Sequence, residues 1–352
     1  MATFRVDMAR IAEMKKHPNA DRLDLAKVEG LGFQFCVGRD EYKVGDTVVY
    51  FPIDAVLPDQ IADGLNIRNH LAGTKKNRVK TVFLREQIGQ GVVCKPSAVF
   101  PEGTEVPPVG TDVAALLGVT KYEPPEVFVA GARLLPLPEG LGFYDIEGAE
   151  RYQPVVDLLM DSLVYISEKL EGSNSSTVKN PENGTVNVCQ HGYLIAVDEG
   201  ATNTYMEAAK WGGFPEILDS IKPEVPMMIA LRGELLGPNI QGNIYKLAKH
   251  EIRLFDVKVG GRYMGPEEFE ATVPDPGKRV PVIAKNVILR EWLAERTLQE
   301  ASNGMSLLNP QVRREGIVIR PMVEQYVDFG DGSRQRLIIK QRSPVYLAKE
   351  KD

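Results

Sequence analysis

Six side chains that could do chemistry stand at the edges of strand-like runs in the second half of the chain. They are Lys169, Glu234, Phe255, Glu315, Lys340 and Arg342. Lys169 closes an apolar, β-prone run, and the small residues Gly172, Ser173 and Asn174 follow it as a sharp turn, so its amine is expected at a strand end. Taken one at a time, each of these side chains has an ordinary structural explanation, as a solvated surface charge or as an aromatic ring of the core. Their common placement and order favour a shared role.

The elements that position these residues follow from periodicity. Residues 151–163 carry apolar side chains at helical spacing after Pro154, which predicts a helix leading directly into the Lys169 strand. The pair Asn183-Gly184 then predicts a hairpin. Beyond it we expect a helix over 205–221, strands over 227–237 and 252–261, a charged helix near 286–301 and strands over 315–323 and 336–345. This mixture predicts an α+β domain.

The first hundred residues have a different pattern. Short runs of alternating apolar and polar residues are separated by glycines, which predicts a small antiparallel β-barrel. Residues 100–140 are rich in proline and glycine, with one short helical piece expected at 111–118, and mark the domain boundary. We therefore expect domains at 1–115 and 116–352.

Composition sets the class of protein. A chain of 352 residues with 43% hydrophobic residues can fill two cores, and its net charge of −6 means that any nucleic-acid binding must use a local patch. No signal-like start and no apolar run of membrane-span length is found, so an intracellular protein with no membrane association is expected. The three cysteines are isolated and are expected to be reduced core thiols.

Basic residues of the first domain gather in two clusters. These clusters comprise Lys15, Lys16, His17 and Arg22, and then Lys75, Lys76, Arg78 and Lys80. Either they are solvated turns that protect strand edges, or they form a groove that follows a phosphate backbone. Candidate stacking rings are Phe33, Phe35, Tyr42 and Phe83, although aromatics at period-two spacing are more often core.

The segment IAEMKKHPNADRLDLAKVEG, residues 11–30, resembles the opening of OB-fold tRNA-binding modules, in which a His-Pro-Asn-Ala-Asp turn precedes a strand. The resemblance covers about twenty residues. It supports the barrel fold of the first domain more than it identifies a ligand.

Three motifs of the second domain, EKLEGSN, RGELLG and EGIVIR, together with RLFDV and IIKQRS, resemble the ordered motifs of covalent nucleotidyltransferases. Within that superfamily the chain is most similar to ATP-dependent RNA ligases, especially RNA ligase family five. This resemblance implies an all-β OB barrel followed by an α+β nucleotidyltransferase domain. It also implies ATP and Mg²⁺ or Mn²⁺ as cofactors, and RNA with 3′-hydroxyl and 5′-phosphate ends, as in a nicked duplex, as substrate of a monomeric repair enzyme.

The resemblance also implies residue roles. Lys169 would attack the α-phosphate of ATP, and Glu315 would help to hold the metal. Glu234 would contact the ribose, Phe255 would stack on adenine, and Lys340 with Arg342 would grip the α-phosphate. Gly172 and Asn174 complete the nucleotide site, Asn174 near the metal or the nick end, whereas Glu171 is either a metal-shell or a structural residue.

The chemistry makes one demand on Lys169. Its amine must be poised near pKa 7 to 8, about 3 units below a free lysine, which requires burial, a nearby cation and a metal together.

Two departures from the family pattern remain. Gln190 and His191 stand where many members carry an arginine, and Lys340-Gln341-Arg342 replaces a Lys-x-Lys ending. The alternatives are a DNA ligase, a capping-type enzyme, or a non-catalytic RNA- or tRNA-binding protein.

Overall fold

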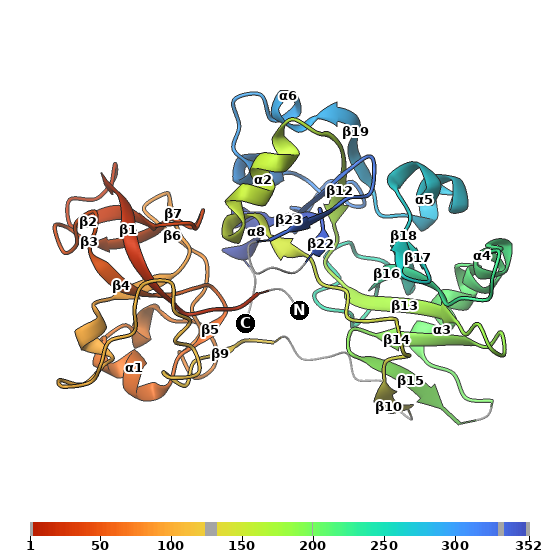
Figure 1. Ribbon diagram of the computed structural model, residues 1–352, viewed down its shortest axis with the longest axis horizontal. Coiled ribbons are helices and arrows are strands. Elements are labelled where there is room, and N and C mark those ends of the chain that lie inside the picture. The colour runs from red at the N-terminus through yellow and green to blue at the C-terminus, as the bar shows by residue number, and fades with distance from the viewer. Residues whose placement is uncertain (1–2, 124–131, 199, 330–333, 350–352) are drawn as a thin grey trace. The chain divides into compact units, whose positions relative to one another are not determined.

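The computed structural model describes residues 3–123, 132–198, 200–329 and 334–349. The chain forms two compact units, each described here by itself (Figure 1). The barrel unit comprises residues 2–124, 147–154 and 344–352, and the two-sheet unit comprises 125–146 and 155–343. The boundary expected near residue 115 lies inside the first segment of the barrel unit, to which two later segments return. None of the helices in the described ranges has the length and apolar character of a membrane span.

The barrel unit is built on five antiparallel strands in the order β3-β2-β1-β4-β8. They are β1 (Asp7–Lys16), β2 (Leu23–Val28), β3 (Phe35–Gly38), β4 (Thr47–Phe51) and β8 (Val92–Cys94). Gln90 N donates to Gln34 O at 2.7 Å, joining the chain just before each edge strand, as expected of a closing barrel. Val48 and Tyr50 of β4 pack into one core cluster, whereas Val49 and Phe51 pack into another. The continuous apolar run of β4 thus serves two cores.

Short elements complete the barrel unit. They are β5 (Ala55–Val56), α1 (Asp59–Gly64), η1 (Arg68–His70), β6 (Val82–Leu84), β7 (Gln87–Gly89), η2 (Pro96–Ala98), β9 (Thr120–Lys121), β11 (Glu147–Gly148), η3 (Ala149–Arg151) and α8 (Pro344–Leu347). The helical piece expected at 111–118 is wrong. Leu117 N does donate to Val113 O at 3.0 Å, but the chain turns away at Gly118, whose φ is 66°. One such turn cannot nucleate a stable helix.

The larger sheet of the two-sheet unit, here called the large sheet, has seven antiparallel strands in the order β10-β15-β14-β13-β16-β17-β18. They are β10 (Ala132–Pro136), β13 (Ser173–Lys179), β14 (Val186–Gln190), β15 (Tyr193–Val197), β16 (Ile229–Leu236), β17 (Glu251–Val259) and β18 (Arg262–Tyr263). The expected hairpin at Asn183-Gly184 is confirmed between β13 and β14. β10 was missed, because it lies in the segment that composition marks as a linker.

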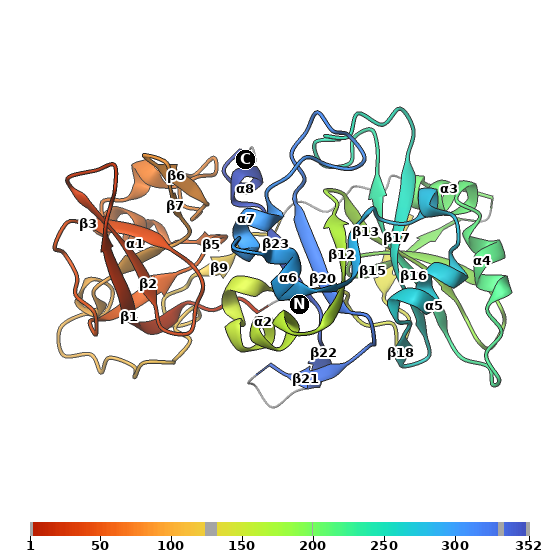
Figure 2. The same cartoon turned by 90° about the horizontal axis from the view of Figure 1, so that it is seen from above.

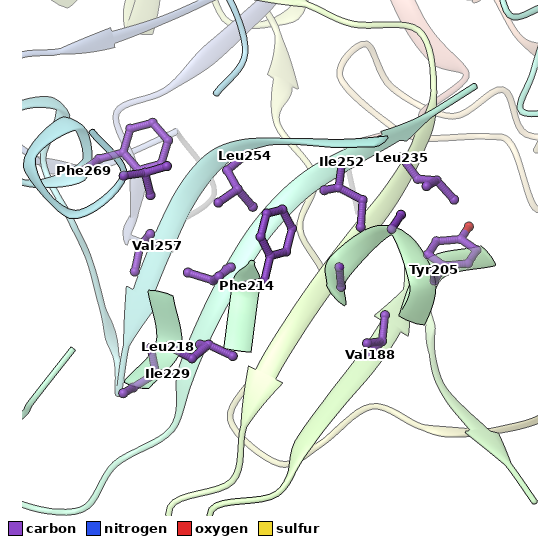
Figure 3. Packing of buried hydrophobic residues seen from close by; sticks show 14 of the residues in the cluster. Val188, Tyr205, Phe214, Leu218, Ile229, Leu235, Ile252, Leu254, Val257 and Phe269 are labelled. Atoms are coloured by element: carbon purple, nitrogen blue, oxygen red, sulfur yellow. The ribbon is translucent and has the colours of Figure 1, made fainter. Parts of the chain in front are cut away.

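Three helices cover one face of the large sheet. They are α3 (Thr204–Trp211), α4 (Phe214–Ser220) and α5 (Pro266–Thr272). Figure 3 shows Tyr205, Phe214 and Phe269 packed against strand residues such as Leu254. The helix expected over 205–221 is therefore two helices, broken where Gly213 takes a left-handed conformation at φ 69°.

Four strands of the two-sheet unit lie side by side in the order β23-β20-β12-β19 and are here called the small sheet (Figure 2). They are β12 (Leu163–Lys169), β19 (Val282–Ile288), β20 (Gly316–Pro321) and β23 (Ile339–Arg342). The expected helix before β12 is confirmed as α2 (Gln153–Met160), and η4 (Pro276–Lys278), β21 (Tyr326–Asp328) and β22 (Arg334–Arg336) complete this unit.

The single charged helix expected near 286–301 is wrong. The segment forms α6 (Leu289–Leu293) and α7 (Leu298–Ser302). Ala294 has a φ of 53°, which ends α6, and Thr297 then begins α7 with a capping box to Glu300. The helical pattern of this segment is real, but the cap divides it.

Candidate active site

Lys169 is the last residue of β12, as the sequence predicts. Leu170 follows Lys169 and packs with Leu236 and Tyr245 in a core cluster, which fixes the start of the turn. Gly172 lets β13 come close to β16, since a Cβ there would lie 2.5 Å from Leu235 O and 2.7 Å from the side chain of Glu234. Gly172 is therefore needed by shape.

The Lys169 amine contacts Glu315. Its Nζ lies 2.7 Å from Oε1 and 2.8 Å from Oε2 of that carboxylate. Lys169 pairs with Gly316 across β12 and β20, and Gly316 pairs with Arg342 on β23. A Cβ on Gly316 would overlap the backbone of the neighbouring strand. The EGIV motif thus combines a carboxylate for the lysine with a glycine that lets β23 approach.

Glu234 and Asn174 come from the large sheet. They are a directly opposed pair across β13 and β16, so their side chains share one face. Among the described residues, no hydrogen-bond partner is found for the buried Asn174 Oδ1. Burial raises the pKa of Glu234, Lys169 lowers it and Glu315 raises it, which together give a pKa of about 8. The strand register therefore places Asn174 beside Glu234, a carboxyl group that interacts with the Lys169 amine.

The charge balance at Lys169 differs from the expectation of a low pKa. Burial lowers the pKa of its amine, and Arg342 does so too, as reasoned from the sequence. Glu315 and Glu234 outweigh both effects and hold the pKa above the ordinary value of 10.5. The expectation named burial, a nearby cation and a metal, and the carboxylates that share the site act on the amine in the opposite direction.

Phe255 and Asp256 face the same side of the large sheet because of a β-bulge. Arg232 pairs with Asp256 and Gly233 pairs with Leu254, which leaves Phe255 as an extra residue in β17. Leu254 and Val257, three residues apart, both enter the helix-covered core. Phe255 packs instead beside the Leu170 cluster, with its ring centroid 4.8 Å from that of Tyr144.

Asp256 is fully buried and belongs to an ion cluster between the two sheets. Its Oδ1 accepts from Arg320 at 3.0 Å, and its Oδ2 accepts from Arg336 at 2.6 Å and from Tyr144 Oη at 2.7 Å. Arg336 also donates to Glu324 through both Nε and Nη2. Burial raises the pKa of Asp256, but Arg336 and Arg320 bring it below its ordinary value.

Lys340 lies on β23 two residues before Arg342, and Asp145 Oδ1 is 3.0 Å from its Nζ. Burial lowers the pKa of Lys340; Asp145 raises it in part, whereas Lys169 and Arg342 lower it. The register places Lys340 and Arg342 on the strand face shared with Lys169. The predicted basic pair is thus brought to the lysine.

Sequence reasoning missed Tyr144 and Asp145. They belong to a stretch, residues 140–146, that resembles linker in composition. An aromatic followed by an aspartate, FYD, was the available signal, and it mirrors the LFD of β17. Glu171 accepts from Gly242 N at 3.0 Å, and its own backbone N donates to Tyr245 Oη, which favours its structural alternative.

Gln190 and His191 occupy the position where many members of the family carry an arginine. Gln190 is buried and pairs with Ser175 across the strands, and the His191 ring lies 5.7 Å from that of Phe143.

The oxygen donors beside Lys169 suit a hard divalent cation. In the described part of the chain, no group of three or more His, Cys, Asp or Glu side chains is gathered as a ready metal cluster. Mg²⁺ and Mn²⁺ in phosphoryl-transfer sites are bound through one or two carboxylates, water and substrate phosphate. Glu315 and the Oδ1 of Asn174, which lacks a partner among the described residues, therefore fit such an ion.

The basic residues of the barrel unit divide by exposure. Lys15, Lys16, Arg22, Lys75 and Lys76 are exposed, and Lys80 is half-buried. Arg78 is buried, forms an ion pair with Asp54 at 2.7 Å and stacks 3.7 Å from the Tyr122 ring, so it is a core residue and not part of a surface groove. Among the candidate rings, Phe33, Phe35 and Tyr42 are buried, and Phe83 is exposed.

The His-Pro-Asn-Ala-Asp turn acts as a clamp on the β6–β7 hairpin. His17 Nδ1 accepts from Asn19 N at 3.1 Å, which leaves Nε2 to donate to Leu84 O at 3.0 Å. Asn19 Nδ2 donates to Arg85 O and to Glu86 Oε2, both at 3.0 Å. The motif that signals the barrel from sequence thus has a structural role in it.

Comparisons with known proteins agree with this arrangement. Residues 162–341 match the model of the RNA ligase family, and residues 5–96 match that of an OB-fold domain. The structure of Naegleria gruberi RNA ligase with PPi is similar over 99% of both chains, with 26% identity and a TM-score of 0.79. A lysine-to-alanine mutant of that ligase with ATP and Mn is 25% identical over 98% of this chain and 99% of that one, with a TM-score of 0.77.

A lysine-to-methionine mutant of the Naegleria gruberi ligase with AMP and Mn is 25% identical over 98% of both chains, with a TM-score of 0.76. No curated protein sequence matches the chain.

Proposed function

This chain belongs to the RNA ligase family, and from that premise we propose that it uses ATP to seal RNA 3′-hydroxyl and 5′-phosphate ends. The observation that carries the proposal is the contact of the Lys169 amine with Glu315, 2.7 Å apart at the end of β12, with Glu234 and Lys340 around it. Solved structures of the similar Naegleria gruberi enzyme are described as holding PPi and, in lysine mutants, AMP or ATP with Mn.

Sealing proceeds in three displacements. The Lys169 amine, after losing a proton, attacks the α-phosphorus of ATP; a P–N bond forms, the α–β P–O bond breaks and pyrophosphate leaves. The RNA 5′-phosphate then attacks the AMP phosphorus and displaces lysine, giving an adenylylated RNA end. The 3′-hydroxyl finally attacks the 5′-phosphate, AMP leaves and a phosphodiester forms.

The residues around Lys169 take the roles that the family resemblance implies. Phe255 stacks on adenine and Glu234 contacts the ribose hydroxyls. Lys340 and Arg342 hold the α-phosphate in line with the amine, where positioning and charge supply most of the catalysis. Gly172 permits the close turn.

Glu315, with Asn174 nearby, would hold Mg²⁺ or Mn²⁺, which neutralises phosphate charge when bound. The pKa of Lys169 is raised by Glu315 and Glu234. Any cation that draws on those carboxylates therefore also frees the amine to lose its proton.

The barrel unit grips RNA near the break through its exposed cations. The best candidates are Lys15, Lys16, Arg22, Lys75 and Lys76, with Lys80 half-buried beside them. The substrate is a nicked duplex met in RNA repair, and the enzyme acts as a monomer.

Covalent label transfer tests the proposal. Purified protein with Mg²⁺ or Mn²⁺ should acquire label from α-labelled ATP and not from α-labelled GTP, and Lys169→Ala should acquire none. Nicked duplexes with RNA or DNA at the 3′-hydroxyl side should be sealed only when that side is RNA. Label from GTP would indicate a capping-type enzyme, sealing of all-DNA nicks a DNA ligase, and no label under any condition a non-catalytic RNA-binding protein.

A further inference from the structure

Residues 140–145 cross the face of the large sheet that carries Arg232 and Glu234. Lys258 Nζ donates to Gly140 O at 2.6 Å, and Arg232 Nη2 donates to Gly142 O at 2.9 Å. Arg232 is itself fully buried and also donates to Ser176 Oγ. Residues 140–145 are here called the strap. Hydrogen bonds to its backbone fix the start of the strap, and this positions the side chains of its last two residues, Tyr144 and Asp145.

The first of those side chains, Tyr144, lies against Phe255. The ring centroids are 4.8 Å apart with an interplanar angle of 39°, and Tyr144 Oη donates to Asp256 at 2.7 Å. The bulge in β17 is what presents Phe255 and Asp256 together on this face. One tyrosine can therefore contact the ring with its own ring and the carboxylate with its hydroxyl.

The second side chain, Asp145, is 3.0 Å from Lys340. The two side chains are 18% and 21% exposed, so the pair is mostly shielded from water and stronger than a surface ion pair. Lys340 also has Lys169 and Arg342 as cationic neighbours, which lower its pKa. A carboxylate here neutralises part of a positive cluster whose proposed partner is a phosphate.

Two adjacent residues of the strap thus contact the side chains that the proposed function assigns to the nucleotide. Tyr144 contacts Phe255, the residue assigned to adenine, and Asp145 contacts Lys340, the residue assigned to the α-phosphate. We propose that Tyr144 and Asp145 hold the place of the nucleotide, and that Asp145 sets nucleotide affinity by competing with a phosphate for Lys340. The inference rests on the proposed function. Before ATP is gripped, the Asp145–Lys340 pair opens, and the fraction of molecules in the open state scales the apparent affinity.

Removal of the charge of Asp145 tests the competition. In a Lys169→Ala background, which binds without reacting, Asp145→Asn should tighten ATP binding by about tenfold if the pair is closed in about nine molecules of ten. Isothermal titration calorimetry with Mg²⁺-ATP measures it. Asp219→Asn is the matched control, because Asp219 forms an aspartate–lysine pair with Lys179 at 2.6 Å on an exposed surface and should leave the affinity unchanged.

Asp145→Ser, which also removes the charge, provides a second variant, and the thermal midpoint of each variant without ATP checks folding. Unchanged or weaker ATP binding in both folded variants would overturn the strap proposal. Such a result would mean that the Asp145 carboxylate does not compete with the nucleotide. Absence of ATP binding in every variant would overturn it as well.

The two proposals fail separately. Labelling of the Lys169 enzyme without tighter binding by Asp145→Asn would remove the strap proposal and keep the ligase. Tighter ATP binding by Asp145→Asn, with no label transfer to the protein that carries Lys169, would keep the strap proposal and remove the ligase.

Discussion

Two charge clusters lie in the two-sheet unit, and they differ in how completely their members are satisfied. Around Asp256, two carboxylates meet two guanidinium groups, and both oxygens of Asp256 accept charged donors. Around Lys169, the carboxylates of Glu315 and Glu234 lie among the cations Lys169, Lys340 and Arg342, burial raises the pKa of Glu234 to about 8, and Asn174 Oδ1 has no hydrogen-bond partner among the described residues. Buried charge whose partners are fixed holds the fold together, whereas a strongly shifted pKa beside an unpartnered oxygen is typical of a functional site.

The largest expected effect breaks this comparison at its reactive side. Lys169→Met should reduce label transfer from ATP by at least about 1000-fold, because the nucleophile is lost. Its free energy of unfolding should change less than that of the Asp256 variant below, because the paired Lys169 and Glu315 side chains are 24% and 13% exposed, whereas Asp256 is fully buried. Urea titration measures the second quantity. A stability loss as large as that of the next variant would erase the distinction between the clusters.

The structural side should respond in the opposite way. Asp256→Asn should lower the free energy of unfolding by about 3–5 kcal/mol, because Arg320 and Arg336 keep their charge in a buried place. The folded pKa of Asp256 lies below its ordinary value, so its contribution is present above the unfolded pKa of about 3.9 and fades as pH falls through the folded value. The difference in free energy of unfolding between wild type and variant, measured by urea titration, should accordingly become smaller in acid and stay constant between pH 5 and 8.

A third variant sharpens the role of shape in the reactive cluster. Gly172→Ala should destabilise by about 1–3 kcal/mol and weaken labelling, because the added Cβ meets Leu235 O at 2.5 Å and pushes β13 away from Glu234. Gly261→Ala is the control, since a Cβ there has no neighbour within 4 Å. Thermal melts and labelling of both proteins decide the matter; equal behaviour would mean that the close approach is not required.

The smallest effects extend the same distinction to the barrel unit. Lys76→Ala, at an exposed cation, should weaken RNA binding two- to threefold and reduce the slope of log affinity against log salt by about one, with stability unchanged. Arg78→Ala should lower the free energy of unfolding by about 1–3 kcal/mol, because Asp54 loses its 2.7 Å partner in the core. Filter binding across a salt series measures the effect of Lys76→Ala, and urea titration measures that of Arg78→Ala. If the slope of log affinity against log salt changed only for Arg78→Ala, Arg78 and not Lys76 would be the RNA-binding residue.

Much of this architecture was readable from the sequence. The barrel, the α+β unit and the strands that carry Lys169, Glu234 and Lys340 follow from periodicity, and their motifs agree with the family. The strap was not readable, because residues 140–145, GLGFYD, have no period and their role depends on partners more than a hundred residues away. The direction in which the pKa of Lys169 shifts was not readable for a related reason, since it depends on how near two carboxylates from different sheets approach the amine.

The bulge at Phe255 has a consequence for which changes of chain length the protein can accept. The loop between β16 and β17 can gain or lose residues without altering which side of the sheet any later residue faces. Between Leu254 and Val257 the count is fixed, because one residue fewer would leave a single residue on this face in place of Phe255 and Asp256. The Phe255 ring and the carboxylate that pairs with Arg320 therefore depend on the same extra residue, and a deletion at the bulge would cost the sheet one of them.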